Sequence, residues 1–460
     1  MNVSLVLRRG ATLLIPCLIY LFFLGEENQK LSLYFSLTGM AVTAWMLNVF
    51  PAIGVAALLT FAYMLAGLAG PEVVFKPWTT VLPWLSFAAI ILGIAMEKTN
   101  LAKRVALWCI RLSGGSFNGL AFGFILGGLL LATFLSSILA RMVILCTIAV
   151  GIIDALKIDG KSRISSALIF MAFIAGSGPQ FLVIHSSESN LWAFDVLFKG
   201  TDIHMDFWTY ALQCTPFSVL YTLSSMLLIY LVKGKEVLSG EDLKLFLKRS
   251  YEELGPMKAD EYKLSVMCIL LIAGFVFQPW TGIDPVYFLC VLAMFCYMPG
   301  IDILDPKEIS GLGIMFLIFV TGCMSIGFVG GAVGANVWII GHLVPLLSGW
   351  SENVSVLMSY VVGVIINFAL TPLAGLGAIT PSIGELGKAM NLNPLPIFYA
   401  FNYGLDQYVF PYETVYFLYI FVTERITLRH VVPALLVRMV LCGLLLAFVA
   451  IPWWKCIGLI

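Results

Sequence analysis

The chain is a succession of long apolar stretches separated by short polar breaks. A helix needs about 20 predominantly apolar residues to cross a bilayer, and roughly ten stretches of this length occur. In lipid every backbone N–H and C=O must be paired internally, which leaves helices or a closed barrel. The stretches are too long and continuous for barrel strands, which alternate over about 10 residues. The pattern therefore predicts an all-α polytopic membrane protein.

Four apolar stretches contain an internal break. They are 117–156, 164–198, 353–390 and 396–424. In the first half Ser136 stands in one break and precedes Pro179, in the next break, by 43 residues. In the second half Asn367 precedes Pro411 by 44 residues. Matched interruptions in two halves of a chain mark the binding site of many secondary transporters, so the spacing predicts two repeats with a site between them.

One long polar segment divides the chain near its midpoint. Residues 233–263 carry seven Lys/Arg and seven Asp/Glu. We therefore expect four parts: an N-terminal helix in 1–30, a first repeat at 31–232, a solvated cytoplasmic linker at 233–263, and a second repeat at 264–460 that ends in a helix at 431–451. The apolar run 11–25 is interpreted as a retained first helix, because no small-residue cleavage site follows it.

The distribution of basic residues predicts the orientation. If 117–156 and 353–390 are hairpins that enter and leave on opposite faces, 19 of the 26 Lys/Arg lie on the side of the N-terminus and five on the other. The side rich in Lys/Arg is normally the cytoplasmic one. This indicates inverted repeats with about 11 transmembrane helices plus two re-entrant hairpins, the N-terminus cytoplasmic and the C-terminus outside. The segment 97–111, basic with interleaved apolar residues, is typical of an amphipathic helix on the membrane surface. Short loops favour a bacterial inner membrane.

Composition excludes other classes. The chain is 60% hydrophobic and 11% charged, with a net charge of zero, which argues against a nucleic-acid partner. Its ten cysteines are scattered without a Cys-x-x-Cys pair, so we expect neither disulfides nor a zinc site.

Charged side chains within the apolar stretches are the candidates for chemistry. Arg141 lies one turn beyond Ser137, and a charge at the centre of a membrane helix costs at least about 2.5 kcal/mol. It should therefore have a partner, either a carboxylate or sulfate substrate or a buried carboxylate of the protein. The acidic candidates for that ion pair are Glu188, Asp406 and Glu413. Asp406, Glu413 and His185 are also candidates for proton coupling. Arg438, in the last helix, is interpreted as a snorkelling or pairing residue.

The two pairs of breaks carry remnants of a known motif. The first hairpin tip reads Leu135-Ser136-Ser137-Ile138 and the second Ile366-Asn367-Phe368-Ala369, while the following turns read Ser177-Gly178-Pro179-Gln180 and Phe410-Pro411-Tyr412-Glu413. In architecture and at these positions the chain resembles the divalent anion/sodium symporter family of the ion transporter superfamily. In that family each tip carries Ser-Asn-Thr and each turn a Thr-Pro-Pro-Asn-like sequence. Here the first tip keeps the serine, the second the asparagine, and each turn one proline.

The resemblance implies a secondary transporter of small anions, such as di- or tricarboxylates or sulfate, that works as a homodimer by an elevator motion of the hairpins and broken helices. Half-helix ends at the bilayer midplane attract carboxylates through their amides and cations through their carbonyls. The substrate-binding candidates are Ser136, Ser137, Arg141, Gly178, Pro179, Gln180, Asn367, Thr371, Pro411, Tyr412, Glu413 and Thr414. The coupling-ion candidates are Ser136, Asn367, Asp406, Glu413 and His185. We expect no cofactor, with sodium, protons or anion exchange as the energy source.

Two alternatives stay open. A cation/proton antiporter of the same superfamily would use Asp406 and Glu413 as ion ligands and Arg141 as their counter-charge. A membrane-embedded enzyme is less favoured, because the four histidines are far apart and neither His-Glu-x-x-His nor Gly-x-Ser-x-Gly occurs. No Gly-x-x-x-x-Gly-Lys-Ser/Thr motif is present to bind ATP phosphates.

Overall fold

A computed structural model gives the fold of most of the chain. It describes residues 3–22, 29–47, 50–112, 114–197, 205–235, 240–283, 285–308, 312–335, 337–338, 341–342, 350–369, 372–390 and 392–460. These residues form helices joined by turns, with no strand among them, as the apolar pattern predicts.

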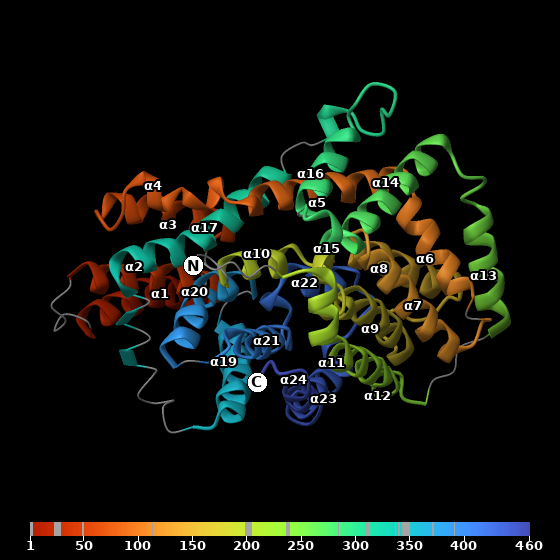
Figure 1. The fold of residues 1–460 in the computed structure, drawn as a ribbon. Coiled ribbons are helices and arrows are strands. Elements are labelled where there is room, and N and C mark those ends of the chain that lie inside the picture. Colours follow the sequence, from red (N-terminus) through yellow and green to blue (C-terminus); the bar gives the residue numbers. More distant parts are fainter. Residues whose placement is uncertain are drawn as a thin grey trace.

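The N-terminal helices pack together with one helix of the second half. They are α1 (Val3–Phe22), α2 (Gln29–Met46), α3 (Ala52–Leu65), α4 (Pro71–Val74) and the short η2 (Lys76–Thr79), joined by α17 (Leu312–Val333). Their buried apolar side chains form a core separate from the main one. The Tyr34 hydroxyl donates to the Ile326 carbonyl at 3.0 Å and so joins α2 to α17. Figure 1 shows these helices gathered at one end of the molecule.

A sharp bend precedes the first hairpin. Helix α5 (Val81–Lys98) is followed by α6 (Leu101–Arg111) at an angle of 67°. Asn100 at the bend has a φ of 61°, a left-handed conformation that asparagine tolerates better than most residues. The amphipathic segment expected at 97–111 thus forms a helix from Leu101 onward, with one face buried and one exposed.

The first half continues with a broken path through the core. Its helices are α7 (Phe117–Ala132), α8 (Ile138–Ala155), α9 (Arg163–Ser177), the 3₁₀ turns η3 (Gly178–Phe181) and η4 (Ile184–Ser186), α10 (Glu188–Leu197), α11 (Phe207–Leu227) and α12 (Ile229–Lys233). Helix α9 is buried along its length and ends where Pro179 lacks an N–H for the next helical bond. The breaks expected at Ser136 and Pro179 are therefore breaks in the structure as well.

The linker between the halves is partly packed. It contains α13 (Gly240–Glu252), whose Leu243 and Leu247 are buried, and leads into α14 (Ala259–Val276). Arg104 on α6 donates to Glu261 at 2.6 Å and to the carbonyls of Leu254 and Gly255. The solvated linker expected from the sequence thus has one solvated face, because these contacts hold it against α6 and its neighbours. Two further helices follow, α15 (Gln278–Thr281) and α16 (Pro285–Phe295), and η5 (Pro306–Glu308).

The second half repeats the interrupted plan. Its helices are α19 (Glu352–Ala369), α20 (Pro372–Met390), α21 (Pro394–Leu405), η6 (Pro411–Glu413), α22 (Val415–Val422), α23 (Leu428–Leu445), the π-turn η7 (Leu446–Ala450) and α24 (Ile451–Cys456). In Figure 1 α19 to α24 lie together below α10 and beside α11.

Each half packs the arm before its break onto the following broken helix through a glycine. A Cβ added at Gly128 of α7 would stand 1.9 Å from the Ala175 carbonyl of α9. A Cβ at Gly363 of α19 would stand 2.3 Å from the Phe401 carbonyl of α21. Neither contact leaves room for a Cβ atom, so each half contains a helix pair whose close approach requires a glycine.

The helices are suited to a membrane by length and composition. Among the described residues four helices are long and apolar enough to cross, at Ile138–Ala155, Arg163–Phe181, Phe207–Lys233 and Leu428–Cys456, or five if α5 and α6 count as one bent span. Shorter apolar helices include α3, α7 and most of α17 and α19. The eleven crossings, the inverted orientation of the repeats and the re-entrant path of the hairpins stay predictions.

Candidate functional site

At the first break, which comprises residues 133–137 after α7 and 178–187 after α9, Arg141 holds together three backbone segments. Its side chain is fully buried on the first turns of α8. The guanidinium donates to the carbonyls of Gly176 at 3.0 Å and Ser186 at 2.7 Å, and to that of Leu135. These carbonyls come from the end of α9, from η4 and from the break after α7. Since carbonyls at helix C-terminal ends carry partial negative charge, a fixed cation is stabilised there.

His185 makes a second link at the same break. Its Nε2 forms a hydrogen bond of 2.7 Å with the Thr133 carbonyl, just after α7. The ring stacks on Phe275 of α14, with centroids 3.6 Å apart. His185 therefore joins the break after α7 to η4 and anchors both against α14.

At the second break, which comprises residues 406–414 between α21 and α22 and the end of α19, Glu413 accepts hydrogen bonds where Arg141 donates them. Its carboxylate accepts the backbone N–H groups of Val409 at 2.9 Å and Phe410 at 3.1 Å. The Asn367 amide, near the end of α19, donates to the same carboxylate at 3.1 Å and to the Gln407 carbonyl at 3.1 Å. Three N–H donors thus converge on one buried carboxylate, and they tie the end of α19 to the break between α21 and α22.

The two halves meet at Asp406. Its carboxylate accepts from the Gln180 amide at 2.6 Å and from the Arg438 guanidinium at 2.6 Å. Arg438 also donates to the Asp406 backbone carbonyl at 2.9 Å. Gln180 belongs to η3 of the first half, Asp406 follows α21 in the second, and Arg438 lies on α23. All three side chains are at most 6% exposed.

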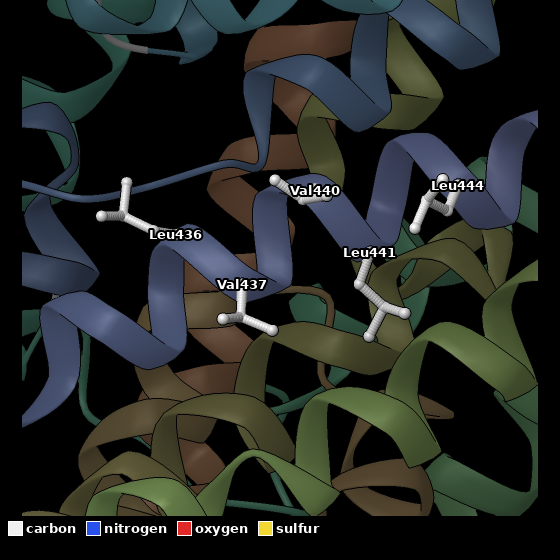
Figure 2. A pocket seen from close by; sticks show the side chains of 5 residues that line it. All are labelled: Leu436, Val437, Val440, Leu441 and Leu444. Carbon is white, nitrogen blue, oxygen red and sulfur yellow. The ribbon is translucent and has the colours of Figure 1, made fainter.

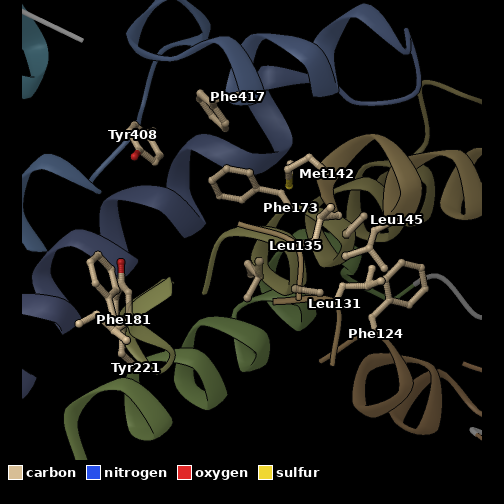
Figure 3. Close-up of a cluster of buried hydrophobic side chains, with 14 of the residues drawn as sticks. Phe124, Leu131, Leu135, Met142, Leu145, Phe173, Phe181, Tyr221, Tyr408 and Phe417 are labelled. Carbon is tan, nitrogen blue, oxygen red and sulfur yellow. The ribbon is translucent and has the colours of Figure 1, made fainter. Parts of the chain in front are cut away.

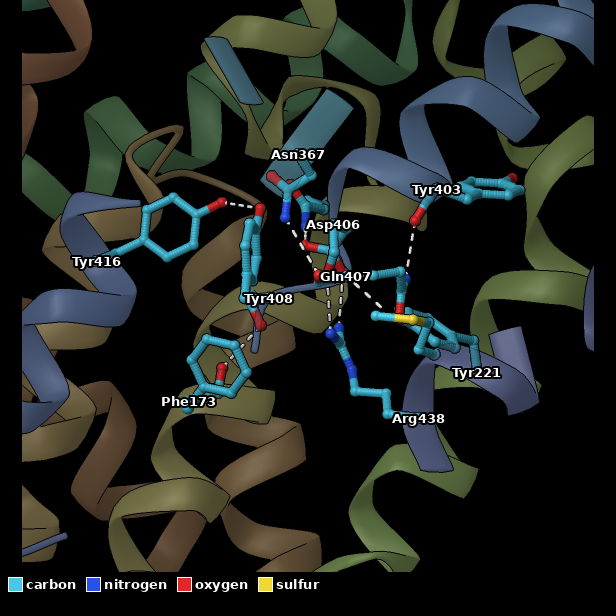
Figure 4. Close-up of polar contacts among 12 residues, drawn as sticks. Phe173, Tyr221, Asn367, Tyr403, Asp406, Gln407, Tyr408, Tyr416 and Arg438 are labelled. Carbon is cyan, nitrogen blue, oxygen red and sulfur yellow. Dashed lines mark hydrogen bonds and ion pairs between the residues drawn. The ribbon is translucent and has the colours of Figure 1, made fainter. Parts of the chain in front are cut away.

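Tyr221 of α11 completes the connection. It donates to Asp406 at 3.3 Å and accepts from the Gln407 amide at 2.9 Å. Figure 4 shows Tyr221, Asp406, Gln407 and Arg438 converging, with Asn367 above them. We name the following set the central polar network: Gln180, Tyr221, Asn367, Asp406, Gln407, Glu413 and Arg438.

Aromatic side chains surround this network. The Arg438 guanidinium lies 4.7 Å from the Tyr221 ring centroid and 5.8 Å from that of Phe173. Phe173 in turn contacts Tyr408 and Phe417 (Figure 3). Excluding water strengthens the hydrogen bonds and makes an unpaired charge there costly.

Two acceptors in the network are still open. Among the described residues, Asn367 Oδ1 and Gln407 Oε1 are buried side-chain oxygens without a hydrogen-bond partner. Both residues adjoin the second break, and Asn367 also contacts Glu413. Carboxamide and carboxylate oxygens are the ligands that hard cations prefer, and an amide oxygen also accepts from a protonated group. These two oxygens are therefore the candidates at the second break for contact with a bound ion or with a donor group of a substrate.

The remaining candidates line the breaks. Ser136 is buried, and Ser137 caps α8 by accepting the Ala140 N–H at 3.4 Å. Gly178 and Pro179 open η3, Pro411 opens η6, and Thr414 is buried directly before α22. Thr371 and the side chains of Tyr412 and Glu188 lie outside the described residues.

The buried charges are paired differently from the ion pairs that the sequence predicted for Arg141. The carboxylate candidates for pairing with Arg141 included Asp406 and Glu413, yet Asp406 pairs with Arg438 and Glu413 with amide donors. Arg438 pairs rather than snorkels. Sequence reasoning missed Tyr221 and Gln407. Gln407 carried a signal, since it follows Asp406 in an apolar stretch, whereas Tyr221 is one of many tyrosines in apolar helices.

An apolar depression lies outside the central polar network. It runs along the outer face of α23 and is lined by Leu436, Val437, Val440, Leu441 and Leu444 (Figure 2). With no polar group to bind an anion, it suits lipid chains or apolar protein surface rather than a substrate.

Comparison with known proteins identifies the family. The family model for the sodium:sulfate symporter transmembrane region matches residues 5–460. The chain belongs to this family. It is therefore an integral membrane protein and a transporter of the anion symporter/antiporter family, as its motif remnants suggested.

Several proteins with names are similar to this chain. The L-tartrate/succinate antiporter of Escherichia coli (strain UTI89 / UPEC) is 23% identical over 358 residues, covering 72% of this chain and 70% of the relative. The protein of the same name from Escherichia coli (strain K12) is 22% identical over the same length. Inner membrane protein YbhI of Escherichia coli (strain K12) is 25% identical over 206 residues, 44% of this chain and 43% of that protein.

Proposed function

We propose that this symporter-family chain is a secondary transporter that exchanges small dicarboxylates across a bacterial inner membrane. The observation that carries the proposal is the bond between Gln180 and Asp406, which joins the helix breaks of the two halves at one buried point. Transporters with repeated halves bind their solute between such breaks. The named tartrate/succinate antiporters, matched over most of their length, favour dicarboxylates over sulfate.

The charge at the first break supports a proposal of exchange without sodium. The Arg141 guanidinium sits among the carbonyls of Leu135, Gly176 and Ser186, where a coupling cation would otherwise find its ligands. A tethered cation neither enters nor leaves with the substrate. It supplies permanent positive charge near a carboxylate substrate, so the substrate need not bring sodium to this break.

The second break supplies the other half of the site. Asn367 Oδ1 and Gln407 Oε1 face no partner within the described protein and are placed to accept from a hydroxyl of a substrate such as tartrate or from a protonated carboxyl group. Gln180 contacts Asp406, so substrate bound between the breaks would contact both halves at once.

The elevator motion and the homodimer belong to the same proposal. The moving unit would be α7 to α10 with α19 to α22. Glycine contacts within each half and the hydrogen bond between Gln180 and Asp406 across the halves support its movement as one body. The cation/proton antiporter reading is not retained, because Asp406 is already occupied by the Arg438 guanidinium at 2.6 Å.

Flux measurements test the proposal. Proteoliposomes preloaded with unlabelled succinate should take up labelled succinate or tartrate, while empty vesicles should not, with or without sodium outside. Arg141→Gln should abolish exchange, and Arg425→Gln, at an exposed ion pair with Asp154, should retain it. Uptake by empty vesicles that requires sodium would refute exchange, and uptake of sulfate alone would refute the substrate class.

A further inference from the structure

Basic side chains gather where α13 of the linker meets the end of α6 and the start of α7. A surface depression there is lined by Arg111 at the end of α6, Gly115 just before α7, and Lys244, Leu247 and Lys248 on α13. Three of the five lining residues are basic and none is acidic. The depression shares no lining residue with the central polar network, and neither the transport proposal nor the family assignment uses it.

The basic groups are held in place by the fold. The Arg111 guanidinium stacks on the Tyr251 ring of α13, with 4.8 Å between guanidinium carbon and ring centroid. Gly115 has a φ of 85°, and a Cβ there would stand 2.6 Å from the Gly240 carbonyl and 3.2 Å from the Lys244 Cβ. The close approach of Gly115 to the start of α13 thus brings Lys244 alongside Arg111.

The surroundings match a membrane interface. Beside Arg111 on α6, Trp108 and Leu112 are 45% and 59% exposed, and Leu245 on α13 is 47% exposed. Basic residues next to exposed Trp and Leu on an amphipathic helix are typical of a helix lying between headgroups and acyl chains. The N-terminus of α7, capped by Ser116, adjoins Gly115 and adds the partial positive charge of a helix start.

We propose that this depression binds the headgroup of an anionic phospholipid. The phosphate would contact Arg111, Lys244 and Lys248, while the acyl chains would lie against Trp108, Leu112 and Leu245. Charge complementarity selects an anion, and the adjoining apolar side chains select a lipid over a free phosphate. Basic pockets beside membrane helices bind anionic headgroups in this way. Bound lipid would hold α13 against the first hairpin, to which Phe246 already connects it through its contact with Gly151.

Native mass spectrometry of the full-length protein tests the site directly. Phosphatidylglycerol and phosphatidylcholine with the same acyl chains would be titrated onto the protein in detergent. The double variant Lys244→Gln/Lys248→Gln should bind phosphatidylglycerol about tenfold more weakly, with phosphatidylcholine binding unchanged. Lys244→Arg/Lys248→Arg should keep the preference for phosphatidylglycerol.

Matched controls separate this site from general attraction. Arg249→Gln removes the same charge from α13 at a position that does not line the depression, and should weaken binding less than twofold. Glu252→Gln removes the carboxylate 3.8 Å from the Lys248 ammonium group and should strengthen phosphatidylglycerol binding about twofold. The proposed site would be wrong if Arg249→Gln and the double variant lost equal affinity for phosphatidylglycerol, or if the double variant lost none. If inorganic phosphate binds through the same lysines and phosphatidylglycerol is not preferred over phosphatidylcholine, the ligand is not a lipid headgroup.

Discussion

The two helix breaks of this symporter-family protein are held by charges of opposite sign. At the first, Arg141 donates to three backbone carbonyls, and at the second, Glu413 accepts two backbone N–H groups and the Asn367 amide. A broken helix exposes carbonyls at one end and N–H groups at the other. The comparison shows that this chain satisfies each kind of end with a side chain of the complementary charge, and that the two breaks are held by different residue types.

The buried ion pair of Asp406 and Arg438 lies at the second break, and breaking it should have the largest effect on stability. Arg438→Leu leaves Asp406 buried without its cation, so we expect a loss of about 3–5 kcal/mol. Denaturation of the purified protein in detergent measures it.

The double variant Arg438→Met/Asp406→Leu supplies the control for that prediction. It removes both charges and should be more stable than Arg438→Leu alone, since no ion is left unpaired. Equal stability of the single variant and the unaltered protein would show that the ion pair between Asp406 and Arg438 does not stabilise the fold.

Removing the charge at each break sharpens the comparison itself. Arg141→Met strands three carbonyls and should cost about 2–4 kcal/mol. Glu413→Gln keeps an acceptor oxygen and should cost about 1 kcal/mol. Thermal unfolding of the two variants shows which substitution lowers stability more.

Arg425→Gln serves as the exposed reference for both breaks, because its ion pair with Asp154 is solvated and should be worth under about 1 kcal/mol. If Arg141→Met unfolds at the same temperature as Arg425→Gln, the guanidinium does not hold the first break.

The glycine contacts test whether the halves are equivalent in packing. Gly128→Ala and Gly363→Ala each push a methyl group into a carbonyl of the neighbouring helix, and each should cost about 1–3 kcal/mol. Gly10→Ala, where a Cβ meets nothing within 4 Å, is the control and should change stability little. A large loss in one half alone, seen by the same unfolding measurement, would mean that only that half depends on the close approach.

Much of the architecture was readable from the order of residues. The apolar runs predicted helices near the positions where the structure has them, and the breaks at Ser136, Pro179 and Pro411 interrupt helices in the structure. The helix α13 inside the polar linker was not expected, because its burial rests on two leucines among many charges. Local composition reports such a segment as solvated even when one face is packed.

The sequence by itself determined the membrane environment, the helical class, the duplicated breaks and the supply of buried charges, since these depend on local hydropathy and on residues that end helices. Tertiary structure alone decided how the charges are paired. Asp406 stands 32 residues from Arg438 and 226 from Gln180, yet contacts both. Distance along a chain does not fix which buried cation meets which carboxylate, because each pair forms only where packed helices bring two charges together and exclude the water that would otherwise solvate them.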